Sequence, residues 1–305
     1  MKSLWRGNAN AWECDELGHL NVKFYLAKAM QAVAHLAHEA GLDAPFRDGA
    51  SATLILRELH INFIAEARPG AALSISGGIR TIADSEMTAE LVMSHADGGP
   101  AAGFTLTLDH AVPSNGQAFR WPARFTEKAQ GLMVPVPEAC QANGLPPADG
   151  RKDVSLKRAN ALDLREIGRG MFGQEDCDSF GFMRPEVLFG KVSDSAIHLR
   201  EAFPEESESP ASDDLALAGA LLECRIRVKR RPRAGDLFVI RSGLIEAGPS
   251  VRKLAHWVLD PVSGRPWWTT EGVAAMLDLK ARRIRKAEGA LLDTLRAGCR
   301  TDFGG

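Results

Sequence analysis

The chain has 305 residues, 45% of them hydrophobic, so it can bury the core of two ordinary domains. Its 37 Lys and Arg residues nearly balance its 39 Asp and Glu residues, which excludes the strong overall field of a nucleic-acid-binding or membrane-surface protein. No stretch approaches the roughly 18 consecutive apolar residues of a membrane span, and the N-terminus lacks the apolar segment of a secretory signal. We therefore expect a soluble cytoplasmic protein.

The cysteines are scattered and odd in number, without any Cys-x-x-Cys pair, which argues against a disulfide framework or a zinc knuckle. Two of them, Cys14 and Cys177, have acidic residues on both sides. Because neighbouring carboxylates disfavour a thiolate, we expect both to be structural rather than nucleophilic. The five are Cys14, Cys140, Cys177, Cys224 and Cys299.

A short motif and its degenerate copy organise the chain. The run from Asp15 to Asn21 reads Asp-Glu-Leu-Gly-His-Leu-Asn, and the run from Asp178 to Arg184 reads Asp-Ser-Phe-Gly-Phe-Met-Arg. The offset is 178 minus 15, or 163 residues. This shared spacing indicates a duplicated unit with one complete and one eroded site, which favours an enzyme. Other pairs at the same offset are Gly7 and Gly170, Cys14 and Cys177, Lys28 and Lys191, and His35-Leu36 and His198-Leu199.

The residues after the first motif predict a helix from Val22 to Ala40, with apolar side chains at steps of three and four and Gly41 as the stop. Further apolar residues cover most of its circumference, so we expect this helix to be enclosed on several sides. Alternating segments broken by Gly, Pro and Asp then predict strands near 52–67, 71–82, 86–96 and 101–112.

The second half repeats this plan. Residues 113–160, rich in Pro, Gly and polar groups, predict a linker between a first unit, 1–112, and a second unit, 161–280. A helix followed by an antiparallel meander in each unit predicts an α+β fold. The tail, 281–305, is expected to be partly helical, over Arg283–Ala297, and the acidic stretch Pro204–Asp214 to be a solvated loop. The strands expected in the second unit lie near 220–231, 236–246, 251–260 and 267–279.

An Asp-x-x-Gly-His-x-Asn run, an apolar helix and a meander together resemble the hotdog-fold thioesterases of the 4-hydroxybenzoyl-CoA thioesterase type. The tandem arrangement resembles the double-hotdog acyl thioesterases, including the acyl-carrier-protein enzymes, over nearly all of the chain outside linker and tail. The resemblance implies a double hotdog, two antiparallel sheets each wrapping a long central helix and pairing within one chain. Such chains could pair further as a homodimer.

The resemblance also implies a thioester hydrolase acting on an acyl-CoA or acyl-carrier-protein substrate, with no metal and no cofactor beyond the coenzyme A of the substrate. Asp15 matches the family's catalytic aspartate, and Val22 matches the donor to the thioester carbonyl. Asp15 would attack the thioester carbon or activate a water, alternatives that the sequence leaves open. His19 would orient Asp15 or the water.

The residues support this chemistry independently. Asn21 can cap the helix by accepting a hydrogen bond from the backbone of Lys23 or its neighbour. The N–H of Val22 then lacks an intrahelical acceptor and can donate to an oxygen that gains charge in the transition state. The alternative for the motif alone is a tight turn and helix cap without catalysis.

Other candidates are weaker. Tyr25, the only tyrosine, is expected in the core. His35 and His38 could share a metal, but a polar helix face accounts for them. Glu58 could be a second catalytic carboxylate or a salt-bridged strand residue.

The basic run from Arg225 to Arg233 could bind the phosphates of coenzyme A, with Arg225, Arg227 and Lys229 on one strand face and Arg231 beyond it. The alternative is a solvated strand face. The matching segment of the first unit is less basic, which favours a site that joins the first unit's Asp to this strand.

Two other functions stay open: a hotdog hydratase or dehydratase, and a non-catalytic acyl-CoA-binding protein. Within the second copy, Phe182 replaces the His, Arg184 the capping Asn, and Pro185 the donor Val22. Because proline has no N–H, we expect only the first site to be active.

Overall fold

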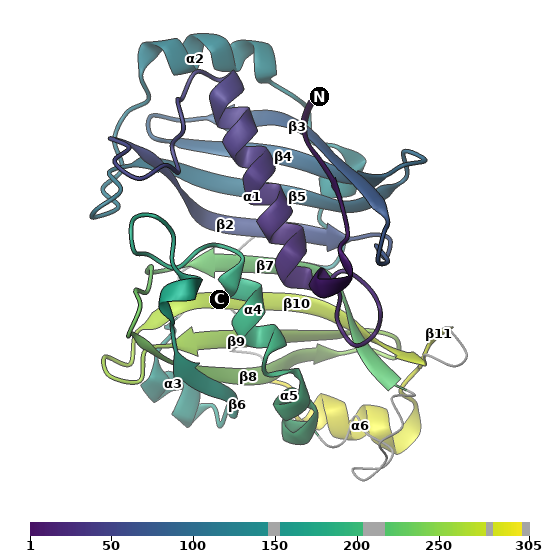
Figure 1. The fold of residues 1–305 in the computed structure, drawn as a ribbon. Coiled ribbons are helices and arrows are strands. Elements are labelled where there is room, and N and C mark those ends of the chain that lie inside the picture. Colours follow the sequence, from purple (N-terminus) through teal and green to yellow (C-terminus); the bar gives the residue numbers. More distant parts are fainter. Residues whose placement is uncertain (146–152, 204–216, 279–282, 301–305) are drawn as a thin grey trace. The chain divides into compact units, whose positions relative to one another are not determined.

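The computed structural model describes residues 1–145, 153–203, 217–278 and 283–300 (Figure 1). The expected loop Pro204–Asp214 lies outside the described residues. The chain forms two compact units: unit 1 comprises Met1–Ala142 and Gly173–Gly190, and unit 2 comprises Asn143–Phe172 and Lys191–Gly305. The eroded motif therefore belongs to unit 1 by its contacts, although it stands in the second half of the sequence.

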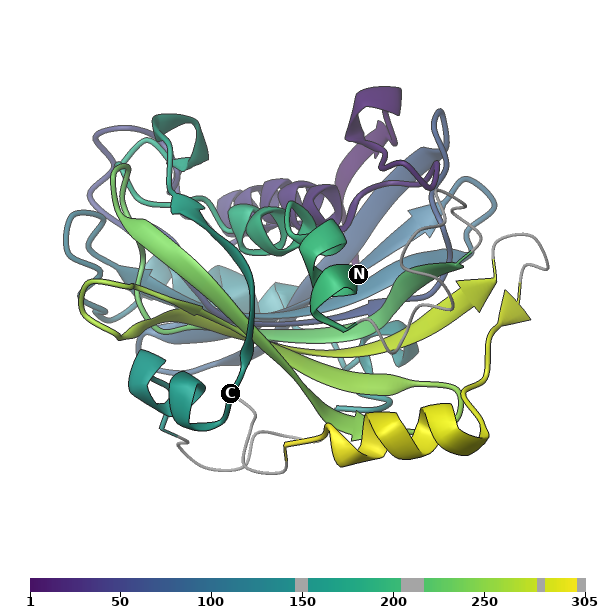
Figure 2. The same ribbon diagram turned by 90° about the horizontal axis from the view of Figure 1, so that it is seen from below.

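Unit 1 is an antiparallel sheet with a long helix on one face. Its strands follow the order β1-β3-β4-β5-β2. The helix α1, Val22–Glu39, buries eight side chains and lies along the sheet (Figures 1 and 2). The helix and the four strands expected after it are confirmed. The elements are β1 (Lys2–Asn8), the 3-10 helix η1 (Ala11–Glu13), β2 (Thr53–Phe63), β3 (Ala72–Ile82), β4 (Glu86–His95) and β5 (Pro100–Ala111).

The described part of the expected linker contains structured segments that pack on unit 1. The helix α2, Ala123–Ala129, carries Phe125, whose ring stacks 4.0 Å from that of Trp121. Farther on, the amide of Asn62 donates to the carbonyls of Ala139 and Gln141, at 2.9 and 2.7 Å. Apolar rings and paired backbone groups thus hold this segment against the sheet. Two 3-10 helices complete it, η2 (Gln130–Leu132) and η3 (Glu138–Cys140).

Unit 2 contains a second antiparallel sheet, in the order β7-β10-β9-β8-β6, with β11 paired to β10. The copy is exact at its start: β6 and η4 lie 163 residues after β1 and η1, since 2 plus 163 is 165 and 11 plus 163 is 174. By its contacts η4 (Gln174–Asp176) belongs to unit 1. The elements of unit 2 are α3 (Leu156–Ala161), β6 (Arg165–Met171), β7 (Leu217–Val228), β8 (Leu237–Ala247), β9 (Arg252–Leu259), β10 (Pro266–Asp278), β11 (Arg283–Ile284) and α6 (Gly289–Ala297).

The expectation of a long central helix in both copies is wrong for the second. There the helix is broken into α4, Val187–Ser193, and α5, Ala196–Ala202. The break falls at Ser193-Asp194-Ser195, where the first copy has Met30-Gln31-Ala32. The hydroxyl of Ser195 donates to the carbonyl of Lys191 at 3.0 Å. Short polar side chains of this kind compete for backbone groups and disfavour a continuous helix.

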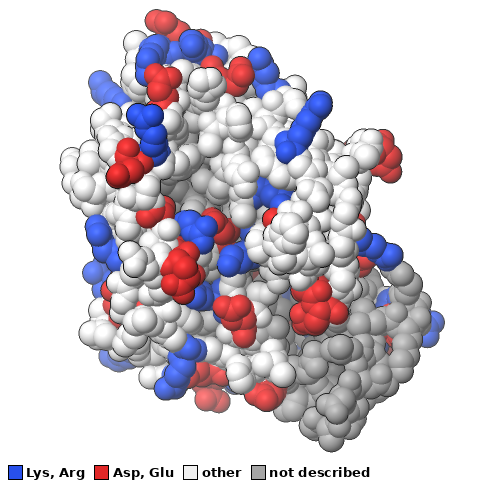
Figure 3. All heavy atoms as spheres, in the orientation of Figure 1, with Lys and Arg blue, Asp and Glu red and all other residues white. Residues whose placement is uncertain are grey.

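No helix among the described residues is long and apolar enough to cross a membrane. On the face drawn in Figure 3, basic and acidic side chains are interspersed rather than gathered by sign. This agrees with the near balance of charges in the sequence.

The buried His256 on β9 leads to a prediction about stability. Burial lowers its pKa from 6.5 to about 4, so the unfolded chain binds the proton more tightly than the folded one. The free energy of unfolding should therefore be unaffected above pH 6.5 and fall as the pH drops from 6.5 towards 4, by about 3 kcal/mol. Urea unfolding at pH 7.5 and 4.5 measures this loss. His256→Gln should show a smaller loss, and an equal loss would contradict the assignment.

Candidate active site

Asp15 opens a tight turn directly before α1. Its N–H donates to the carbonyl of His19 at 2.9 Å, and its own carbonyl accepts from Gly18 at 3.0 Å. Gly18 has a φ of +80°, in the left-handed region that favours glycine. The carboxylate Oδ1 accepts the N–H of Leu17 at 3.0 Å, and the side chain stays 21% exposed. The turn thus fixes the orientation of a carboxylate that solvent can reach.

His19 lies between two carboxylates. Its Nδ1 is 3.5 Å from Oδ1 of Asp15, and its Nε2 is 3.7 Å from Oε1 of Glu66. The imidazole is 23% exposed. The structure thus brings the predicted pair, Asp15 and His19, together. It also adds Glu66, which the sequence did not single out.

Asn21 caps α1 as predicted: its side-chain oxygen accepts the N–H of Lys23 at 3.0 Å. Val22 is the first helical residue, and its N–H has no acceptor among the described residues. This N–H lies at the positive end of the helix dipole and can bind an oxygen that acquires negative charge. The structure thus combines a carboxylate turn with a helix N-terminus; the catalytic roles of these residues stay predictions.

A buried ion pair that the sequence analysis missed ties the turn to the helix. Nζ of Lys28 lies 2.8 and 2.7 Å from the two carboxylate oxygens of Glu13. Lys28 is only 4% exposed. Glu13 also accepts the N–H of Asn10 with its side chain and that of Asn21 with its carbonyl, at 3.0 and 2.9 Å. A signal was available, since Glu13 and Lys28 recur 163 residues later as Asp176 and Lys191.

We expect Lys28→Met to lower the free energy of unfolding by about 3–5 kcal/mol, because it leaves the nearly buried Glu13 carboxylate without its cation. Chemical denaturation at neutral pH measures the change. Lys28→Met combined with Glu13→Gln should recover part of the loss, since the buried charge is then removed as well. A loss below about 1 kcal/mol in the single variant would assign the pair to the weak class of surface ion pairs.

Tyr25 lies in the core, as expected, and is 4% exposed. Its ring meets that of Phe63 edge-on, with 5.3 Å between centroids. Burial, with smaller contributions from the charges of Glu66 and Asp15 and against a hydrogen bond with the backbone of Ala67, raises the pKa of Tyr25 to about 12. The hydroxyl of Tyr25 therefore stays protonated at neutral pH.

The other candidates of unit 1 lie on α1 and β2, and among the described residues they do not complete a metal site. His35 and His38 are exposed on α1, and no group of three metal-ligating side chains occurs in the part of the chain that the structure describes. Glu58 lies on β2 opposite Thr107 of β5.

The basic residues on and after β7 differ in exposure, although their alternation in the sequence predicts one common face. Arg225 is 6% exposed, and its guanidinium donates to the carbonyl of Leu145 at 3.4 Å. Arg227 and Arg231 are half-buried, whereas Lys229 is exposed. Binding of coenzyme A by these four residues stays a prediction, to which the buried Arg225 is the least suited.

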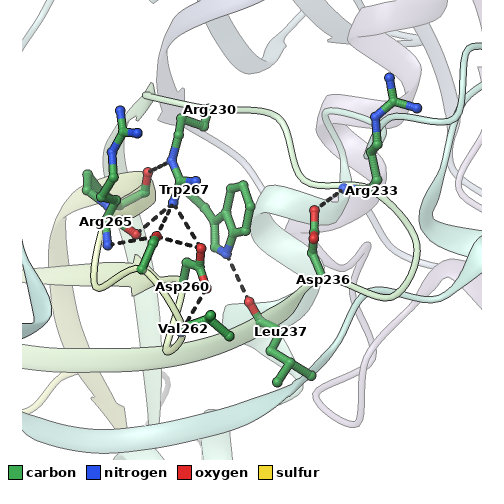
Figure 4. A network of polar contacts seen from close by, with 10 residues as sticks. Arg230, Arg233, Asp236, Leu237, Asp260, Val262, Arg265 and Trp267 are labelled. Atoms are coloured by element: carbon green, nitrogen blue, oxygen red, sulfur yellow. Dashed lines mark hydrogen bonds and ion pairs between the residues drawn. The ribbon is translucent and has the colours of Figure 1, made fainter.

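Arg230, which stands between Lys229 and Arg231 in the sequence, has a structural role. Its guanidinium lies 4.0 Å from the centroid of the Trp267 ring and donates to the carbonyls of Arg265 and Pro266, at 3.0 and 3.2 Å (Figure 4). Its Nη2 is 3.5 Å from Asp260. Burial opposes ionisation of Asp260, but hydrogen bonds from Ser263 and backbone N–H groups, together with the Arg230 charge, lower its pKa. Arg230 thus pins the turn after β9 to the end of β7.

The eroded copy keeps the turn of the complete one. Oδ1 of Asp178 accepts the N–H groups of Phe180 and Phe182, at 2.9 and 3.0 Å. Gly181 has a φ of +77°, close to that of Gly18. The turn alone therefore does not distinguish a working site from a lost one.

The helix start after this second turn differs. Arg184, at the capping position, donates to the carbonyl of Glu175 at 2.7 Å and pairs with Glu186 at 3.0 Å. The helix α4 begins only at Val187, two residues after Pro185, the counterpart of Val22. Because Pro185 has no N–H, the eroded copy lacks the donor that α1 offers at this position.

Comparison with known proteins places this arrangement in a family. The profile of the thioesterase-like superfamily matches residues 9–130. Betainyl-CoA thioesterase from Pseudomonas aeruginosa is 30% identical over 146 residues, which are 44% of this chain and 88% of that protein.

Two solved structures share the fold over 88% of this chain. An acyl-ACP thioesterase from Bacteroides thetaiotaomicron has a TM-score of 0.61 at 10% identity, over 96% of its length. The 12:0-ACP thioesterase from Umbellularia californica has a TM-score of 0.63 at 9% identity, over 92% of its length. The matched segment contains the Asp15 turn and α1, and the chain belongs to the thioesterase-like superfamily of thioester hydrolases.

Proposed function

We propose that this chain hydrolyses an acyl-CoA or acyl-carrier-protein thioester at the Asp15 turn, and that its two units are the two hotdog units of a double hotdog. The observation that carries the proposal is the Asp15 carboxylate held in front of a capped helix whose first N–H, that of Val22, has no acceptor among the described residues. A nucleophile or base and an oxyanion donor are the two groups that thioester hydrolysis requires.

The proposed reaction begins with the carbonyl oxygen of the thioester accepting the N–H of Val22. In the general-base route, Asp15 takes a proton from a water as the water oxygen bonds to the carbonyl carbon. The negative charge that develops on the carbonyl oxygen strengthens its hydrogen bond to Val22. Collapse of this adduct breaks the carbon–sulfur bond, and the leaving thiolate takes the proton that Asp15 removed from the water. His19 orients the carboxylate or the water.

In the nucleophilic route, Asp15 itself bonds to the carbonyl carbon and expels the thiolate, and water then hydrolyses the resulting anhydride. Both routes use water and the residues of the turn, and neither uses a metal or an added cofactor. Hydrolysis in water enriched in oxygen-18 separates them over a single turnover. Label in Asp15 identifies the nucleophilic route, because only attack of water on the Asp15 carbonyl of the anhydride places it there. Label in the released acid alone is the result that the general-base route requires.

For an acyl-CoA substrate, Arg227, Lys229 and Arg231 are the proposed phosphate contacts, because Arg225 is buried against Leu145. Guanidinium groups bind phosphate oxygens in pairs, which suits the 3′-phosphate and the pyrophosphate. Replacing Lys229 and Arg231 by Ala should raise KM for acyl-CoA with little change in kcat.

The test of the function is a panel of acyl-CoA and acyl-carrier-protein thioesters assayed for free thiol. Release of thiol with turnover supports hydrolysis. Addition of water to an enoyl-CoA without thiol release would instead support a hydratase, and tight binding without turnover a non-catalytic acyl-CoA-binding protein.

A further inference from the structure

Three aromatic rings, one of them on the first turn of α1, are packed in a row. The ring of Tyr25 meets that of Phe63, at the end of β2, with 5.3 Å between centroids and an angle of 87°. The ring of Phe63 in turn meets that of Phe189, on α4, at 6.3 Å and 74°. All three residues belong to unit 1. Tyr25 and Phe189 are each 4% exposed, and Phe63 is half-buried. We call these three residues the aromatic row.

The aromatic row lies close to the proposed reaction centre. Tyr25 follows Val22 by three residues, which places it on the same side of α1 one turn later. The other end of the row is held by close packing. A Cβ on Gly190 would lie 3.2 Å from Cδ of Lys23, so the glycine lets α4 approach the first turn of α1.

These positions bear on the size of the acyl group. A carbonyl that accepts the Val22 N–H has its acyl chain starting at the first turn of α1. The Tyr25 side chain tilts towards the N-terminus of α1, so its ring lies within the rise of about 4.5 Å that separates residues 22 and 25, and a chain running along the helix has room for only a few carbon–carbon bonds before it meets the ring. Aromatic side chains packed edge to face are rigid and fill space densely. A longer chain would have to displace them.

The relatives leave the acyl size undecided. One of them is named for a betainyl group, which is short, and a structural neighbour for a 12:0 acyl group, which is long. The eroded copy provides an informative difference. The counterpart of Tyr25 is Leu188, since 25 plus 163 is 188, and the counterpart of Phe63 is Val228, which pairs with Trp268 of β10 as Phe63 pairs with Ala102 of β5. Two of the three rings are thus absent where the donor N–H is also absent.

We propose that the aromatic row sets the upper limit of the acyl group, so that the substrates are thioesters of short acyl groups. This inference rests on the proposed hydrolysis at Asp15 and adds its substrate class. The eroded copy then also has a function, because Phe189, which follows the eroded motif in the sequence, forms one end of the aromatic row. Tyr25, Phe63 and Phe189 are specificity-determining residues in this account, not catalytic ones.

The experiment measures kcat/KM for wild type, Phe189→Ala and Phe63→Ala on acetyl-, butyryl-, betainyl-, octanoyl- and lauroyl-CoA. Wild type should prefer the groups of four carbons or fewer in a chain. Each shortened side chain should raise the ratio of octanoyl-CoA to butyryl-CoA kcat/KM by at least about tenfold. Contacts in a binding pocket provide discrimination between substrates of this size. A structural role alone would lower both activities together and leave this ratio unchanged.

Phe125→Ala is the matched control. Phe125 is fully buried, but it lies on α2, where Lys128 packs beside Gly41 at the other end of α1. It should lose stability without a change in the ratio. If Phe189→Ala does not fold, Phe189→Leu keeps most of the packing and should shift the ratio in the same direction.

Two results would overturn the inference. The first is a wild type that prefers lauroyl-CoA, and the second is a ratio that stays constant in all folded variants while butyryl-CoA is still hydrolysed. In both cases the proposed function survives. A wild type that releases thiol from no member of the panel, nor from acyl-carrier-protein thioesters, overturns the function and this inference together.

Discussion

Asp15→Asn should lower kcat/KM for the best thioester by roughly 10⁴ or more, the scale of losses seen when a nucleophile or its base is removed. An amide neither attacks the carbonyl carbon nor takes a proton from water. Asp178→Asn should stay within a few-fold of wild type, because its copy has Pro185 where a donor N–H is required. Steady-state hydrolysis of one substrate by both variants measures the contrast.

The two substitutions control for each other. Both carboxylates accept backbone N–H bonds inside the same kind of turn, from Leu17 in one copy and from Phe180 in the other. The oxygen of an asparagine can accept these bonds, so both variants should melt at similar temperatures. Loss of activity in Asp178→Asn with an active Asp15→Asn would transfer the site to the eroded copy and overturn this account.

The parts of the site that the sequence predicted are those built from neighbouring residues. The Asn21 cap, the glycine of the turn and the start of α1 depend on side chains within a few positions of one another. The strands followed from alternation and from breaks at Gly and Pro. The exact repetition of β1 and η1 as β6 and η4 explains why a single offset located both copies.

What the sequence did not reveal depends on contacts between distant residues or on competing local preferences. The residues around Lys28 do not show that its ammonium is buried on Glu13, fifteen positions earlier; only the recurrence of the pair 163 residues later points to it. Alternation placed Arg225 on an exposed face, whereas it is buried and donates to the carbonyl of Leu145. The broken second helix was readable in principle, since Ser193-Asp194-Ser195 is a poor helix centre, but the duplication argued for a copy of α1.

Val22→Pro tests the proposed oxyanion donor with little disturbance of the fold. Proline is well accepted at the first helical position, where its missing N–H has no intrahelical acceptor to lose. It also restricts the preceding residue to extended backbone, and Asn21 already has a φ of −63° and a ψ of 141°. The eroded copy carries Pro185 at this position in its natural sequence. The melting temperature should therefore change by only a few degrees.

The expected effect on catalysis is large. Loss of one oxyanion donor typically lowers kcat by about 10²–10³, and KM should change little because the bond strengthens mainly in the transition state. Val22→Ala is the control, since it shortens the side chain and keeps the N–H; it should stay within a few-fold of wild type. If Val22→Pro retains wild-type kcat, the carbonyl is polarised elsewhere and α1 only supports the turn. If Val22→Ala loses as much as Val22→Pro, the side chain rather than the N–H is what the substrate requires.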